Sequence, residues 1–166
     1  MDTLFNVLHV VSAVFIVGPM AILPMTAMRA VRAGNASQVR TLAKSTNIFS
    51  LLSLLTVLFG FAVMGMSDPK YKTSITTPWI LWSIIAYVIA LGLTLFVVVP
   101  AMRRAADALD GLTSATAAPA VAGGSVPTPA AEAADLEARG YPAIAAGSGV
   151  ASILLVVVVV LMVWKP

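Results

Sequence analysis

The chain has 166 residues, of which 60% are hydrophobic and only 10% are charged. This balance excludes an ordinary soluble domain and is typical of a membrane protein. The formal net charge of +3 is located at the edges of the apolar runs rather than on a nucleic-acid-binding face, so we expect no nucleic-acid partner. There is no cysteine, which excludes disulfides, thiolate metal sites and iron–sulfur clusters.

Four apolar runs have the length of about 20 residues that a helix needs to cross a bilayer. They comprise residues 4–28, 48–66, 79–99 and 143–164. We therefore predict an all-α fold, a four-transmembrane-helix bundle that forms one integral membrane domain over residues 1–166. Asp2 stands where a signal peptide would carry basic residues, so we expect the first run to remain as a membrane helix.

The first run contains the only histidine of the chain, His9, on the same helical face as Asn6. Gly18–Pro19 and Pro24 follow and are expected to kink this helix, because a proline cannot donate a backbone hydrogen bond. An ionisable side chain at membrane depth is a functional hypothesis in its own right.

Two interpretations of His9 compete. It is a ligand for haem or copper, with the thioethers of Met64 and Met66 completing a soft ligand set suited to Cu(I). Alternatively, it is a neutral packing residue that hydrogen-bonds Asn6, Tyr87 or a backbone carbonyl where two helices meet. We favour packing and predict no resident cofactor, because methionine is common in apolar segments and the spacing is unspecific.

Small and polar residues mark the faces along which membrane helices pack, since lipid tails are as apolar as leucine. In the second predicted helix, a stripe with three-four spacing consists of Thr46, Ser50, Ser53, Val57, Gly60 and Met64. Across the chain, the residues expected at helix–helix contacts are Asn6, Ser50, Ser53, Gly60, Ser83, Tyr87, Ala145, Gly149 and Ser152.

Residues 105–140 change composition to Ala, Thr, Gly, Ser and Pro. Such a segment buries too little apolar surface to offset its ordering entropy, so we predict a flexible linker. The stretch AAEAADLEAR near its end is a candidate for a short interfacial helix.

Basic residues predict the orientation of the bundle. Those after the first and third runs are Arg29, Arg32, Arg40, Lys44, Arg103 and Arg104. The positive-inside rule then places both termini outside a bacterial plasma membrane, with the basic connections and the long linker in the cytoplasm. Trp79, Trp82 and Trp164 fall at the outer interface, where indole rings settle.

Catalytic signatures are not apparent. The four runs contain no carboxylate for a proton relay, and no Ser/His/Asp grouping or phosphate-binding glycine loop can be assembled. We therefore expect no enzymatic activity from this chain alone.

The segment LHVVSAVFIVGPM, followed by a short basic loop and a second apolar helix, resembles the opening of an uncharacterised bacterial family of small four-helix integral membrane proteins. The first helix is also similar to membrane domains of the copper-resistance D type, although Gly18–Pro19 stands where those domains more often have two glycines. The Ala/Val-rich, Lys-poor composition is similar to that of actinobacterial proteins, and small helical proteins of that group resemble accessory subunits of the respiratory cytochrome bc–cytochrome oxidase supercomplex.

These observations lead to one main functional hypothesis, a non-catalytic accessory subunit that packs beside a larger membrane complex and its lipids. One alternative is a haem- or copper-binding membrane protein that uses His9. Another is a small homo-oligomeric channel or transporter.

Overall fold

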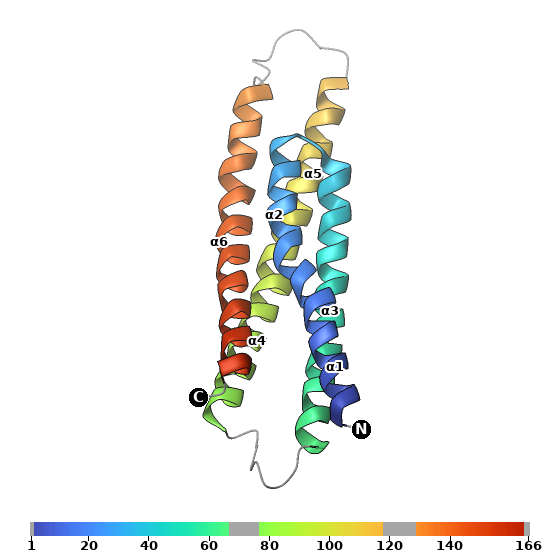
Figure 1. Cartoon of the computed structure of the whole chain (residues 1–166). Coiled ribbons are helices and arrows are strands. Elements are labelled where there is room, and N and C mark those ends of the chain that lie inside the picture. The colour runs from blue at the N-terminus through green and yellow to red at the C-terminus, as the bar shows by residue number, and fades with distance from the viewer. Residues whose placement is uncertain (1, 67–76, 118–128, 165–166) are drawn as a thin grey trace.

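A computed structural model describes residues 2–66, 77–117 and 129–164, which are almost entirely helical. Figure 1 shows four long rods side by side, with the N-terminal end of the first and the C-terminal end of the last at the same end of the bundle. The elements in chain order are α1 (Asp2–Ser12), η1 (Ala13–Val17), α2 (Gly18–Arg32), α3 (Ala36–Met66), α4 (Pro78–Leu93), η3 (Thr94–Val98), α5 (Val99–Ala117) and α6 (Pro129–Trp164).

The prediction of an all-α bundle with four membrane-length helices is confirmed. The apolar, membrane-length helices are Thr3–Arg32, Ala36–Met66, Pro78–Gly111 and Gly140–Trp164. Each of them extends beyond the apolar run that predicted it, because the flanking residues continue the helical hydrogen-bond pattern into more polar sequence.

Two of the long helices contain a five-residue π-helical segment that ends two residues before a proline. The amide of Gly18 donates to the carbonyl of Ala13 and the amide of Val99 donates to that of Thr94, so each bond spans five residues. Pro19 and Pro100 follow directly, and their rings would clash with the carbonyls of Phe15 and Phe96 in a regular α-helix. A π-helical turn relieves this clash while keeping backbone groups paired in lipid. The first rod bends at this place, as its sequence predicts (Figure 1).

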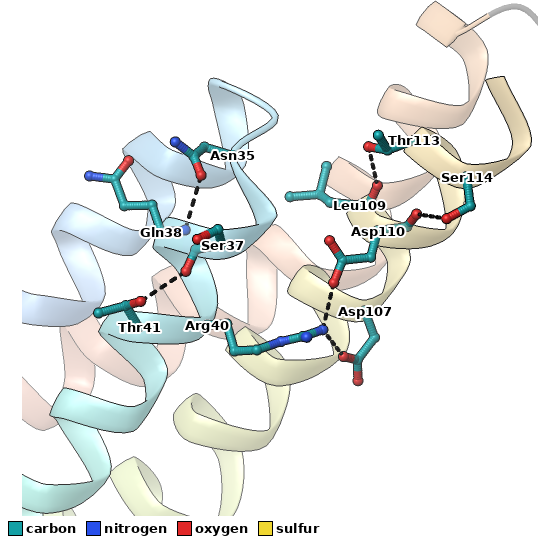
Figure 2. A network of polar contacts seen from close by, with 10 residues as sticks. All are labelled: Asn35, Ser37, Gln38, Arg40, Thr41, Asp107, Leu109, Asp110, Thr113 and Ser114. Atoms are coloured by element: carbon teal, nitrogen blue, oxygen red, sulfur yellow. Dashed lines mark hydrogen bonds and ion pairs between the residues drawn. The ribbon is translucent and has the colours of Figure 1, made fainter. Parts of the chain in front are cut away.

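The connection between α2 and α3 is a tight turn with complete capping. Gly34 has φ +66°, the amide of Gly34 donates to the Val31 carbonyl and the amide of Asn35 donates to the Ala30 carbonyl. This pair of bonds is a Schellman motif, which favours glycine at the left-handed position. The side chain of Asn35 then accepts the amide of Gln38 at 3.0 Å and caps the start of α3 (Figure 2).

The linker predicted over residues 105–140 is corrected at both ends. Residues 105–117 continue α5, and residues 129–140 already belong to α6, which includes the AAEAADLEAR stretch. Alanine and leucine are strong helix formers, and Ala105, Ala106 and Leu109 are buried, so packing supplies the apolar burial that composition alone did not suggest. Residues 118–128 of this prediction lie outside the described residues.

The bundle packs differently at its two ends. Near the α2–α3 turn, a core rich in alanine joins α2, α3, α5 and α6. Toward the end that carries the termini, α1 packs on α3 and α4 packs on α6, whereas these two pairs make few contacts with each other. Figure 1 shows the pairs diverging in this direction. The candidate site lies on the α1–α3 pair.

Candidate functional site

His9 sits at the interface of α1 and α3, directly over a glycine. A methyl group at residue 60 would lie 3.0 Å from Cε1 and 3.3 Å from Nδ1 of His9. The imidazole therefore occupies the space that any other side chain at this position would need. Gly60, predicted as a packing residue from its spacing, allows the ring of one helix to approach the backbone of the next.

The ring is held by a hydrogen bond to the backbone of α3. Nδ1 of His9 lies 2.9 Å from the carbonyl oxygen of Thr56, one helical turn before Gly60. Because a carbonyl can only accept, Nδ1 carries a proton in this bond, and in the neutral form of the ring the lone pair lies on Nε2. The carbonyl has a second lone pair, so it can accept this bond without giving up its bond within the helix. The hydroxyl of Ser12 also donates to the His9 carbonyl at 2.9 Å.

The side chain of Thr56 is buried but lacks a hydrogen-bond partner within the described residues. The residue is 6% exposed, and its hydroxyl is the one buried side-chain nitrogen or oxygen in the described part of the chain that has no hydrogen-bond partner. Burying an unpaired hydroxyl costs free energy. The predicted inward stripe runs through Val57 and therefore omits Thr56, although the spacing from Ser50 and Ser53 to Thr56 is also helical.

One turn deeper, a hydroxyl pair connects α3 to α4. Ser53 donates to the Ser50 carbonyl at 2.6 Å, and its oxygen lies 2.6 Å from the hydroxyl of Tyr87. Since the single proton of Ser53 is used by Ser50, Tyr87 donates to Ser53. Ser50 and Ser53 are fully buried and Tyr87 is 8% exposed.

The predicted thioether ligands lie farther along α3. Met64 and Met66 follow Gly60 by four and six residues, which corresponds to about 6 and 9 Å along the helix axis. Met64 is partly buried, Met66 is 38% exposed, and no hydrogen bond joins either sulfur to His9 within the described residues. The described part of the chain also contains no group of three or more His, Cys, Asp or Glu side chains that could hold a metal ion. Because Nδ1 of His9 is used by the Thr56 carbonyl, Nε2 is the ring nitrogen that could bind a ligand.

The remaining predicted packing residues occupy different environments. Asn6 is exposed, and Ser83 is buried and donates to the Trp79 carbonyl at 2.8 Å. In α6, Ala145, Gly149 and Ser152 are all partly buried. Ser152 donates across to the Ala21 carbonyl of α2 at 3.5 Å.

Of the glycines of α6, Gly147 packs most tightly against a neighbouring helix, although its spacing did not mark it as a packing residue. A methyl group at Gly147 would lie 2.9 Å from Cγ2 of Val98 on η3. At Gly149, which was selected for its spacing from Ala145, the same group would meet nothing within 4 Å.

Four membrane-length helices that meet through glycines and buried hydroxyls define a polytopic integral membrane protein. The chain belongs to the family of predicted integral membrane proteins DUF2269, whose model matches residues 3–124. The matched region contains His9, Thr56, Gly60 and Tyr87. This membership confirms the likeness to a family of integral membrane proteins. No curated protein and no solved structure gives a match to the chain.

Proposed function

We propose that this protein is a non-catalytic accessory subunit that packs beside a larger membrane complex. The observation that carries the proposal is how the buried hydroxyls of the spans are used. Thr46, Ser50, Ser83 and Thr94 each donate to a carbonyl one turn back in their own helix, at 2.7–2.8 Å. Hydroxyls engaged in this way satisfy their hydrogen bonds within one helix, so the buried faces that carry them can pack against neighbouring helices.

The resemblance described above extends the proposal to the class of partner. We propose a respiratory complex of the cytochrome bc–cytochrome oxidase type, in an actinobacterial plasma membrane with both termini outside. The exposed faces of the helices suit such a partner or lipid, since they carry large apolar side chains such as Phe15 and Ile153, which are 68% and 65% exposed.

Native electrophoresis after solubilisation in a mild detergent tests this role. The tagged chain should migrate with larger membrane proteins that carry haem absorbance, and should separate from them in a harsh detergent. The control is an unrelated tagged four-helix protein expressed at the same level. Migration as a lone monomer at every detergent concentration would contradict the proposal.

A second candidate function, ligand binding by His9, is favoured by one specific observation. In the neutral ring, the bond from Nδ1 to the Thr56 carbonyl selects the tautomer that leaves Nε2 unprotonated. Ligand histidines in metal and haem sites commonly donate their other nitrogen to a carbonyl in this way. Within the described residues Nε2 has no hydrogen-bond partner, so it is chemically suited to bind haem iron or Cu(I).

Two substitutions of His9 separate ligand binding from packing. The amide nitrogen of His9→Asn takes the place of Nδ1 and keeps a donor for the Thr56 carbonyl, whereas His9→Ala removes both functions. If His9 is a ligand, both variants should lose the Soret band or the copper of the purified protein. If His9 only packs, the purified wild-type protein should itself show no Soret band and contain no copper. The His9→Asn variant should then unfold at nearly the wild-type temperature.

A further inference from the structure

An open depression of about 510 Å³ lies between α3 and α5, at the end of the bundle opposite the termini. It is lined by Arg40, Lys44, Asn47 and Ile48 of α3 and by Arg103 and Asp107 of α5. The α3 residues are spaced by four, three and one positions, and the two α5 residues by four, so each set shares one helical face.

The charges of this depression are only partly neutralised. Arg40 reaches from α3 to two carboxylates of α5, and its guanidinium lies 2.7 Å from both Asp107 and Asp110 (Figure 2). Both carboxylates are therefore occupied by one arginine. Lys44 and Arg103 form no ion pair within the described residues, which leaves two positive charges among the residues that line the depression.

The polarity of the depression changes along the helix axis. Ile48 is 46% exposed, and it is one turn, about 6 Å, from Lys44 toward the middle of the membrane span. The same face of α3 continues with Leu51 and Leu55, which are 49% and 42% exposed. The cationic side chains therefore lie at the edge of the hydrocarbon region. A row of exposed apolar side chains, which we call the apolar track, extends from them toward the middle of the membrane span.

We propose that this depression, which we call the α3–α5 groove, binds one anionic glycerophospholipid. The phosphate lies between Lys44 and Arg103, where both cations attract it, and the amide of Asn47 donates to one of its oxygens. An acyl chain then follows Ile48, Leu51 and Leu55. A free phosphate or a soluble anion would use the cations but not the apolar track. The inference does not depend on the accessory role or on His9.

Native mass spectrometry of the full chain in detergent, titrated with phosphatidylglycerol or phosphatidylcholine, tests the groove. Each Lys or Arg near a lipid surface contributes a factor of about five to binding, so Lys44→Gln with Arg103→Gln should weaken phosphatidylglycerol binding about 30-fold, and each single variant about fivefold. The charge-preserving pair Lys44→Arg with Arg103→Lys should retain binding.

The matched control is the double variant Arg29→Gln with Arg104→Gln. It loses the same two charges from exposed residues that do not line the groove, so it should bind phosphatidylglycerol as wild type does. Equal weakening in both double variants would show only diffuse attraction and overturn the proposal. Equal binding of the two lipids, or displacement of phosphatidylglycerol by glycerol phosphate, would overturn it as well.

Discussion

At the residue scale, His9 and Gly60 are complementary. The imidazole is anchored by the Thr56 carbonyl and fills the notch left by the absent side chain of Gly60. Both residues stand out in the sequence, His9 as an isolated ionisable group and Gly60 as a small residue with helical spacing. Their pairing cannot be predicted from the sequence, because the spacing along each helix gives no information about the neighbouring helix.

Gly60→Ala should destabilise the protein. The added methyl group would lie 3.0 Å from Cε1 of a ring that is held by its hydrogen bond, and overpacking of this kind costs about 1–3 kcal/mol. Gly65→Ala on the same helix is the matched control, since it meets nothing within 4 Å and should be neutral or stabilise by about 0.5–1 kcal/mol. Unfolding in detergent by SDS titration measures both. Equal effects of the two variants would show that the ring does not depend on Gly60.

Thr56→Val should raise the free energy of unfolding by about 1–2 kcal/mol, because valine has the shape of threonine without the buried, unpaired hydroxyl. Ser53→Ala should lower it by about 1 kcal/mol, since the hydroxyl of Tyr87 loses its acceptor. The same SDS titration applies. Destabilisation by Thr56→Val would indicate that the hydroxyl has a partner in the membrane, such as a ligand or a neighbouring subunit.

At the element scale, local chemistry explains where helices bend and end, but not how they approach one another. The prolines predict the bend of the first rod, and Gly34 with Asn35 accounts for the α2–α3 turn. The bend takes the form of a π-helical turn, because the carbonyls near the proline accept hydrogen bonds from amides five residues later in the chain. Likewise, the helical residues within the predicted linker depend on burial of α5 against α2 and α3.

The packing of α6 gives a prediction at this scale. Gly147→Ala should destabilise the protein by about 1–3 kcal/mol, because its methyl group would lie 2.9 Å from Val98 and push α6 away from η3. Gly149→Ala, two residues along the same helix, should be tolerated, since the space beside it is open. SDS titration of the two variants checks this, and a larger effect at Gly149 would indicate a different rotation of α6.

At the scale of the whole molecule, the indole rings and the lysines and arginines that the structure describes lie at opposite ends of the bundle. The basic residues of α2, early α3 and α5 gather at the end near the α2–α3 turn, whereas the start of α4 and the end of α6 bring Trp82 and Trp164 to the other end. Both indoles are largely exposed, at 62% and 77%. This polarity underlies the proposed orientation.

Single cysteines test that orientation, since the natural chain has none. Thr3→Cys and Ser37→Cys place exposed thiols at opposite ends of the bundle. A membrane-impermeant maleimide should label the first in intact cells and the second only after permeabilisation, because the positive-inside bias keeps the basic end in the cytoplasm. The reverse pattern of labelling would invert the orientation.

The sequence by itself determined the number and approximate position of the membrane helices, the absence of disulfides and the bend at Pro19. These are properties of a segment, set by apolar length, by residue type or by a missing backbone donor. Only the tertiary structure decided that His9 meets Gly60 and the Thr56 carbonyl, that Gly147 rather than Gly149 packs against η3, and that Lys44 and Arg103 line one depression. Those pairings depend on the rotation and register of each helix against its neighbours, which the packing of all four helices sets together.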